Sequence, residues 1–333
     1  MNTNVKILQI GVGSMGKRRI RNLLYLGFTN ITCCDKKPER VEEAKKKYGV
    51  NTVDYKNINW KEFSHVIIST PPDQHIQYAL EAIKNNLHVF IEASVVDELY
   101  DELILLHGEK PELTLAPSCT MRFDPIISKA KEIIDSGKLG KVVSATHYFG
   151  QYLKFWHPYE DIKDFYVSKR ETGGAREIVP FDLVYLVWLF GDICKITSLK
   201  KNSQTLGIDI DDVYSIVCET INNIQLQLTI DVVSKVPYRD TRVILERGNI
   251  EINNVKGELN IYNLDSNSWE SITKNKLMVT YSTEEPYILE LSTFLNATFG
   301  KEKFPYSIEE DHAILKYLFA AEKANEMKLI LEV

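Results

Sequence analysis

The chain has few cysteines, no excess of one charge and no long apolar run. Its five cysteines are an odd number in 333 residues, and no pair has the spacing of a zinc site, so we expect reduced, structural thiols and no bound metal. A net charge of -6 gives no reason to expect a nucleic-acid partner. The basic runs at 17–21 and 45–47 contain no interleaved aromatic residues, so we interpret them as solvated faces of helices.

The longest apolar run, Leu183 to Phe190, is far shorter than the roughly 20 residues that a helix needs to cross a bilayer. The first residues lead into a predicted strand without the basic and apolar segments of a secretory leader. These absences predict a cytoplasmic protein without a membrane partner. The length and a hydrophobic content of 44% suit two globular domains.

What the sequence does contain is a strand, a glycine-rich loop, a helix and a second strand within residues 5–35. In such a loop the first glycine permits a tight turn, the second lets the backbone approach a pyrophosphate, and the third lets the helix pack on the sheet. An acid about 20 residues further on accepts hydrogen bonds from an adenosine ribose. The pattern predicts a dinucleotide-binding unit rather than an ordinary strand, turn and helix. Its cofactor-binding candidates are Gly11, Gly13, Ser14, Met15, Gly16 and Asp35.

The acid also predicts which dinucleotide binds. Asp35 would place an anion beside the 2′-phosphate of NADP, and no arginine directly follows it, so we expect NAD. Lys36 and Lys37 leave NADP possible, because either side chain could turn towards a phosphate.

Apolar strand runs alternate with amphipathic helices up to about residue 120. This alternation predicts a Rossmann domain, a doubly wound parallel sheet, over residues 1–120. From residue 141 onward several strand-like segments alternate apolar and polar residues, so we expect an α+β domain with a large, mostly antiparallel, open-faced sheet over residues 121–333. Pro180 predicts that an apolar helix ending at Phe190 begins or kinks at the proline.

The chain resembles the Gfo/Idh/MocA oxidoreductases in its motifs at residues 70–75 (Thr-Pro-Pro-Asp-Gln-His) and 121–125 (Met-Arg-Phe-Asp-Pro), and at Glu92. The resemblance covers essentially the whole chain. It implies a nicotinamide cofactor, a sugar, cyclitol or nucleotide-sugar substrate, and dimers or tetramers formed through the open face of the sheet. It also implies further cofactor-binding residues, which are Ser69, Thr70, Pro71, Pro72, His75, Glu92 and Arg122.

Two positions depart from the family pattern. The family's Glu-Lys-Pro is Glu92-Ala93-Ser94 here, so the lysine usually assigned to catalysis is absent. The family's aspartate and histidine, four residues apart on a helix, are Glu177 and Phe181. The reaction class therefore cannot be transferred whole.

Moving hydride to or from a carbinol needs a group that takes or gives the hydroxyl proton. The segment 151–177 is richest in such groups, and our catalytic candidates are Glu177, His157, Tyr166, Lys169 and Arg176. The competing interpretations are a salt bridge from Glu177 to Arg176 or Arg170 and a structural hydrogen bond for His157. The sequence thus favours an NAD-dependent oxidoreductase, with a non-catalytic protein that binds dinucleotide and sugar as the alternative.

Overall fold

The computed structural model describes residues 5–156, 161–164, 166–276 and 284–333. The chain forms two compact units. Unit 1 comprises Met1–Thr120 with Thr283–His312, and unit 2 comprises Met121–Ser282 with Ala313–Val333. Among the described residues, no helix is long and apolar enough to cross a membrane.

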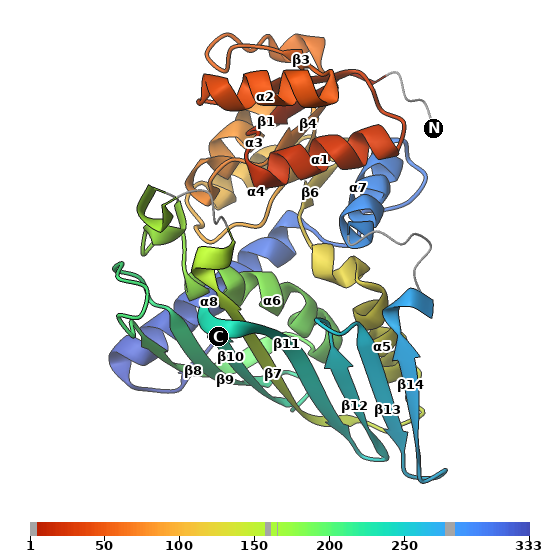
Figure 1. Ribbon diagram of the computed structural model, residues 1–333. Coiled ribbons are helices and arrows are strands. Elements are labelled where there is room, and N and C mark those ends of the chain that lie inside the picture. Colours follow the sequence, from red (N-terminus) through yellow and green to blue (C-terminus); the bar gives the residue numbers. More distant parts are fainter. Residues whose placement is uncertain (1–4, 157–160, 165, 277–283) are drawn as a thin grey trace. The chain divides into compact units, whose positions relative to one another are not determined.

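Unit 1 contains a six-stranded parallel sheet with the strand order β3-β2-β1-β4-β5-β6 (Figure 1). The strands are β1 (Ile7–Ile10), β2 (Ile31–Cys34), β3 (Asn51–Thr52), β4 (His65–Ile68), β5 (His88–Ile91) and β6 (Leu115–Pro117). β1 and β4 are buried at every position, as expected of strands that are covered on both faces. The order reverses between β1 and β4, which confirms the predicted doubly wound sheet.

Helices connect these strands, and one further helix joins unit 1 from the far end of the sequence. The helices are α1 (Ser14–Tyr25), α2 (Pro38–Tyr48), α3 (His75–Lys84), α4 (Tyr100–Gly108) and α7 (Glu285–Thr298). Leu291, Phe294 and Leu295 of α7 share a hydrophobic core with β1 and β5. The sequence suggests a single domain boundary at residue 120. In the structure α7 lies beyond that residue but belongs to unit 1, because side chains of unit 1 bury its apolar face.

Unit 2 contains a nine-stranded sheet with the order β14-β13-β12-β11-β7-β10-β9-β8-β15. All neighbours pair antiparallel except β7 and β10, so the prediction of a mostly antiparallel sheet is confirmed. Its strands are β7 (Val142–Tyr152), β8 (Ile193–Lys201), β9 (Val213–Thr220), β10 (Gln225–Asp231), β11 (Val233–Leu245), β12 (Gly248–Asn253), β13 (Glu258–Asn263), β14 (Ser268–Thr273) and β15 (Leu331–Glu332).

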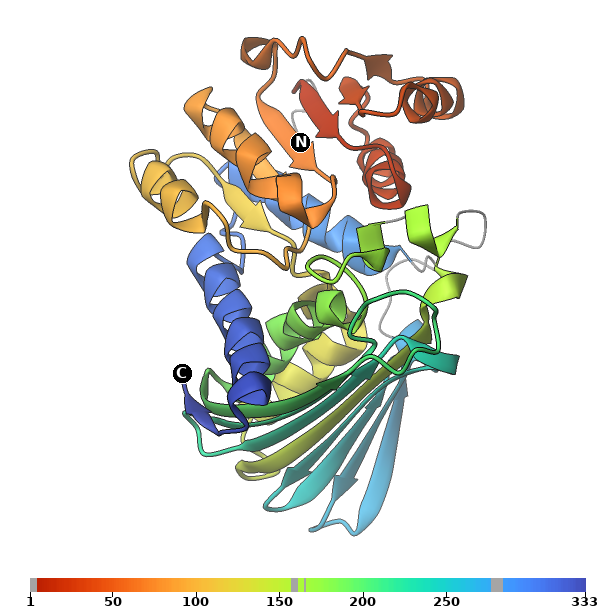
Figure 2. The same ribbon diagram turned by 90° about the vertical axis from the view of Figure 1, so that its left-hand side faces the viewer.

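Three helices of unit 2 lie on one face of this sheet (Figure 2). They are α5 (Pro125–Asp135), α6 (Ala175–Phe190) and α8, whose residues from Ala313 belong to this unit (Ile308–Met327). In the described part of unit 2, no helix covers the opposite face, where Leu199 is 75% and Trp269 is 52% exposed.

Helix α6 runs through Pro180, so of the two alternatives predicted at the proline, a helix start is wrong and a kink stays a prediction. The proline has no N–H group for the carbonyl of Arg176, which costs one hydrogen bond of the helix. The apolar face that α6 buries against β9 and β10 offsets this loss, with Leu183 and Leu186 fully buried. The result places Glu177 in the first turn of a helix rather than in a loop.

Candidate functional site

The glycine-rich loop of unit 1 is tightly packed at two of its three glycines. A Cβ atom at Gly11, where φ is +84°, would lie 2.4 Å from the Ser69 carbonyl oxygen, and one at Gly16 would lie 1.9 Å from the Gly11 carbonyl oxygen. At Gly13 the described residues bring a single atom within 4 Å, Nη1 of Arg40 at 3.4 Å. No side chain caps the start of α1, whose first residues are Ser14 and Met15, so its first N–H groups are available to an anion.

Asp35 lies beside this loop, at the end of β2. Its Oδ2 accepts a hydrogen bond from the Val12 amide at 2.8 Å, and its Oδ1 accepts one from the Lys37 amide at 2.8 Å. Lys36 donates to Gln74 Oε1 at 2.6 Å. Arg40, which the sequence analysis did not single out, brings a guanidinium next to Gly13. The loop therefore has a fixed carboxylate on one side and a cation on the other.

The segment after β4 is held in place by a buried histidine. His75 contacts the Thr70 carbonyl oxygen through Nε2 at 2.7 Å and Ser94 Oγ through Nδ1 at 3.2 Å. Burial lowers the pKa of His75, so the neutral ring is favoured. Pro71 has extended backbone and Pro72 starts a short 3-10 helix that leads into α3. Both ring nitrogens of His75 are engaged, which indicates that this residue supports the segment Thr70-Pro71-Pro72.

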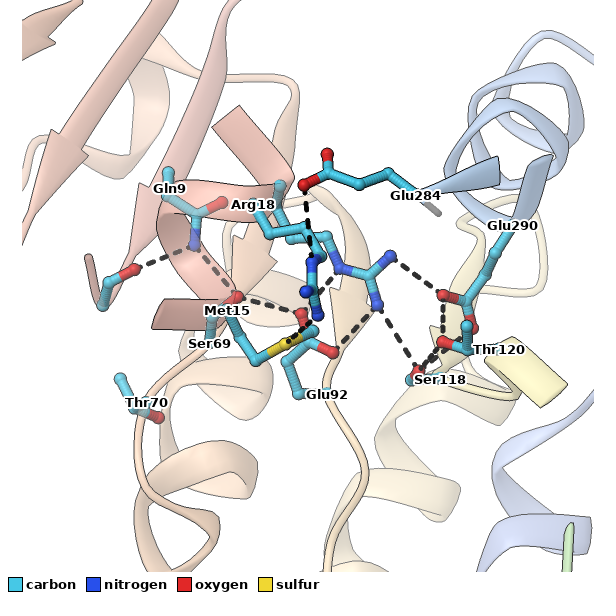
Figure 3. Close-up of polar contacts among 12 residues, drawn as sticks. Gln9, Met15, Arg18, Ser69, Thr70, Glu92, Ser118, Thr120, Glu284 and Glu290 are labelled. Carbon is cyan, nitrogen blue, oxygen red and sulfur yellow. Dashed lines mark hydrogen bonds and ion pairs between the residues drawn. The ribbon is translucent and has the colours of Figure 1, made fainter. Parts of the chain in front are cut away.

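Glu92, at the end of β5 and among the polar residues of Figure 3, forms an ion pair with Arg19. Arg19 Nε and Nη2 donate to the two carboxylate oxygens at 2.7 and 2.9 Å, and Ser69 Oγ donates to Oε1 at 3.1 Å. Nη1 of Arg19 pairs with Glu290 of α7 at 2.9 Å. Arg19 is 0% exposed, so the interpretation of the run 17–21 as a solvated face is wrong at this position. A signal was present in the sequence, since Arg19 lies in one helical stripe with Gly16 and Leu23.

The catalytic candidate Glu177 has an unusual environment in unit 2. The Tyr166 hydroxyl donates to its Oε1 at 2.5 Å. Its Oε2 is buried and has no hydrogen-bond partner among the described residues. Burial raises the pKa of Glu177 to about 7, and the Tyr166 hydrogen bond opposes this shift. The side chain is therefore poised between its acid and carboxylate forms near neutral pH, which suits a group that exchanges protons.

The basic candidates around Glu177 pair with other acids. Arg176 Nε donates to Glu322 Oε1 of α8 at 2.7 Å. Arg170 pairs with Asp209 at 2.6 Å and with Asp211 at 2.8 Å. These pairs explain why a cation does not hold the pKa of Glu177 down, and they contradict the salt bridges to Arg176 or Arg170 that the sequence left open.

The remaining candidates are placed as follows. Lys169 is exposed and follows the short 3-10 helix Tyr166–Ser168. Arg122 Nε donates to the Val184 carbonyl at 3.1 Å within unit 2. His157 lies outside the described residues. Its role as a proton carrier stays a prediction.

One buried polar cluster of unit 2 was not anticipated from the sequence. Asp182 is 0% exposed, its Oδ2 lies 2.9 Å from His147 Nε2 in a hydrogen bond, and its Oδ1 forms an ion pair with Arg239 Nη2 at 3.2 Å. The Arg239 guanidinium lies 5.3 Å from the ring centre of Phe181. Asp182 is thus a paired charge, and Phe181 stacks with a cation. The partners come from β7 and β11, far apart in sequence from α6, so no local pattern could identify them.

Two family models match the chain. Residues 5–101 match the model described as an oxidoreductase family with an NAD-binding Rossmann fold, and residues 127–251 match the GFO/IDH/MocA C-terminal domain. Both models come from one family, and together they span more than half of the chain. The chain belongs to the Gfo/Idh/MocA family. Its unit 1 contains the NAD-binding Rossmann domain of this family.

Curated relatives of this Gfo/Idh/MocA protein match over part of their length. Inositol 2-dehydrogenase from Salmonella typhimurium is 28% identical over 149 residues, which are 42% of this chain and 44% of that protein. Oxidoreductase P35 from Formosa agariphila is 36% identical over 81 residues, which are 24% and 25% of the two chains. The matched segment thus spans less than half of each relative.

Solved structures share the fold over the full length. A levoglucosan dehydrogenase in complex with NADH has a TM-score of 0.87 at 16% identity, with 99% of each chain covered. A myo-inositol 2-dehydrogenase from Lactobacillus plantarum has a TM-score of 0.81 at 18% identity, again with 99% of each chain covered. At such identities the likeness shows the fold of this chain and nothing more.

The residues of unit 1 fit a bound dinucleotide. Thr70 Oγ1 and Gln9 Oε1 are buried polar atoms without a partner among the described residues, at the ends of β4 and β1. The open backbone at Gly13 and the uncapped start of α1 suit a pyrophosphate. Asp35 suits the hydroxyls of a ribose.

Proposed function

We propose that the protein is an NAD-dependent oxidoreductase acting on a sugar or nucleotide-sugar. Hydride would pass between nicotinamide C4 and a carbinol or keto carbon. The observation that carries the proposal is Glu177: one of its oxygens is buried without a partner among the described residues, and this burial raises the pKa of its carboxyl group to about 7. The dehydrogenases among the relatives act on polyols and sugars, which supports this substrate class.

We assign cofactor binding to residues of unit 1 and proton transfer to Glu177. The bound dinucleotide supplies the hydride acceptor. Gly13, the start of α1 and Asp35 would hold its phosphates and ribose, and the segment Ser69–Pro72 and Glu92 would hold its nicotinamide half. Glu177 takes the hydroxyl proton of the carbinol as the C–H bond breaks and the C=O bond forms, and it returns a proton in the reverse reaction. Tyr166 orients the Glu177 carboxylate through its hydrogen bond.

A screen of sugars, cyclitols and nucleotide-sugars tests this function. NADH absorbance should appear with NAD and one substrate class. If NAD binds but no compound of these classes is turned over, the protein instead binds dinucleotide and sugar without catalysis. We keep this non-catalytic alternative because Ala93 and Phe181 stand where the family pattern has a lysine and a histidine.

We predict that NAD binds more tightly than NADP. The Asp35 carboxylate is fixed by two backbone amides, and it would lie next to the additional phosphate of NADP. Asp35→Ser should reduce the difference between the binding free energies of NAD and NADP by about 1 to 2 kcal/mol, the value of a hydrogen bond to a charged group. Titration of both cofactors by intrinsic fluorescence measures this. Equal or tighter binding of NADPH by the unchanged protein would refute the prediction.

We also predict that the uncovered face of the unit 2 sheet forms a homodimer or homotetramer interface. That face presents Leu199 and Val217, which are 75% and 44% exposed on the neighbouring strands β8 and β9. Light scattering should give a multiple of 38.3 kDa, and Leu199→Lys with Val217→Lys should shift the protein towards monomer. Leu105→Lys on α4 is the control, since Leu105 is 72% exposed in unit 1. A monomer at micromolar concentration would end this proposal.

Separately, we propose that the protein is located in the cytoplasm.

A further inference from the structure

Residues at the ends of β1, β4 and β5 in unit 1 share one hydrogen-bonded network (Figure 3). Gln9 at the end of β1 donates to Ser69 Oγ at 3.1 Å, and Ser69 after β4 donates to Glu92 after β5. Arg19 joins Glu92 to Glu290, which lies on α7. The side chain of Glu92 is 12% exposed and those of Arg19 and Glu290 are 0% exposed, so the charges of this network are poorly screened by solvent.

Glu290 is surrounded by hydrogen-bond donors. Its Oε1 accepts from the Cys119 amide at 2.6 Å and from Ser118 Oγ at 3.0 Å. Its Oε2 accepts from Thr120 Oγ1 at 2.7 Å and forms an ion pair with Arg19, whose Nη1 lies 2.9 Å away. The Cys119 amide and the Arg19 guanidinium can only donate, so a protonated carboxyl group would need the Ser118 or Thr120 hydroxyl to turn from donor to acceptor. Burial raises the pKa of Glu290, and the charge of Arg19 and the hydrogen bonds from Thr120 and the Cys119 amide oppose this shift.

With Glu290 as a carboxylate, the network contains one buried cation, Arg19, and two acidic side chains, of which Glu290 is buried and Glu92 is 12% exposed. The neighbouring cations Arg18 and Arg21 share a different acid, Glu284, and are 31% and 40% exposed, so solvent screens them. One negative charge remains uncompensated at the carboxyl end of β5. On a sheet of this order the two halves of a dinucleotide lie on opposite sides of the switch between β1 and β4. With Asp35 on the adenosine side, the nicotinamide side is that of β4 and β5.

We propose that Glu290 makes unit 1 select the oxidised dinucleotide, because the nicotinamide ring carries a positive charge in NAD⁺ and none in NADH. Glu290 acts through Arg19 and Glu92 and is a specificity-determining residue without contact to the cofactor. The proposal rests on the proposed function in one respect, the position of the nicotinamide half near Glu92.

Calorimetric titration of the full chain with NAD⁺, NADH and ADP-ribose tests the proposal. We expect the unchanged protein to bind NAD⁺ more tightly than NADH. Glu290→Gln should lower the ratio of the NADH Kd to the NAD⁺ Kd by about tenfold, as a unit charge at roughly 10 Å would at an effective dielectric constant near 20. ADP-ribose lacks the nicotinamide, so its Kd should stay within twofold. Tighter binding of NADH by the unchanged protein, or an unchanged ratio in Glu290→Gln, overturns the proposal.

Two variants separate charge from packing. Glu290→Asp keeps the negative charge and should keep the ratio, whereas a role in packing alone would make it resemble Glu290→Gln. Glu284→Gln removes a carboxylate directly before the same helix and should leave the ratio unchanged. If Glu290→Gln does not fold, the Kd values of NAD⁺ and NADH for the unchanged protein still test the proposal, because tighter binding of NADH refutes it. Failure of all three ligands to bind refutes the proposed function itself, whereas binding with NADH preferred refutes only the selection by charge.

Discussion

Replacement of Glu177 by Gln should lower turnover by about 10²- to 10⁴-fold while the affinity for the cofactor stays unchanged. The amide has the shape of the carboxylate and keeps an acceptor for Tyr166, but it cannot carry the proton of the reacting hydroxyl group. The measurement is the rate of NADH formation with the substrate found by screening. Glu171→Gln is the matched control, because Glu171 is an exposed acid of the same segment.

The pH dependence gives a second readout of this role. Oxidation of the substrate needs the Glu177 carboxylate, so kcat should rise with pH through a midpoint near the pKa of about 7. The Tyr166 hydrogen bond lowers this pKa, so Tyr166→Phe should move the midpoint upward. In the unfolded chain the same group titrates near the ordinary glutamate pKa of 4.5, so ionisation of Glu177 lowers the stability of the fold as pH rises from 4.5 to 7. Glu177→Gln should lack this loss.

Full turnover by Glu177→Gln would exclude Glu177 as the proton carrier. The remaining candidates would then be His157, Lys169, Tyr166 and water. His157→Asn, measured in the same assay, tests the first of these.

Replacement of Arg19 by Met should lower the free energy of unfolding by about 3 to 5 kcal/mol. The variant leaves Glu92 and Glu290 buried in proximity without their shared cation, and Glu290 is 0% exposed. Attraction to these two carboxylates outweighs burial and raises the pKa of Arg19, so the guanidinium stays charged at any pH of interest. Urea denaturation followed by circular dichroism measures the loss.

Arg21→Met is the matched control for this prediction. Arg21 lies on the same helix and pairs with Glu284, but its side chain is 40% exposed, so its removal should cost about 1 kcal/mol or less. Equal losses in the two variants would show that the buried network contributes no more than a surface ion pair. A double variant, Arg19→Met with Glu290→Gln, should regain part of the stability, since it removes one of the two uncompensated charges.

Local signals were sufficient for much of the fold. Helix α5 begins and ends at local signals, because Asp124 caps the helix through the Ile126 amide, Pro125 occupies the first turn and Gly137 follows its end. The parallel and antiparallel sheets follow from two different hydrophobic patterns, continuous in unit 1 and alternating in unit 2. The glycine loop and Asp35 were identified because turn, phosphate and ribose each need a particular residue type at a particular spacing.

The sequence by itself therefore determined the kinds of element, the two sheets and the dinucleotide motif, since all of these depend on residues close together in the chain. Only the tertiary structure decided that Arg19 is buried, that α7 belongs to unit 1 and that Glu177 has a raised pKa. Arg19 pairs with Glu92 and Glu290, which lie far from it in the sequence. Helix α7 packs on strands from the opposite end of the sequence. The pKa of Glu177 depends on its burial and on the ion pairs that its neighbours form with other acids. Arg176 pairs with Glu322, and Arg170 pairs with Asp209 and Asp211. Charge pairing and desolvation are set by distances in space, which a pattern of residue types along the chain does not contain.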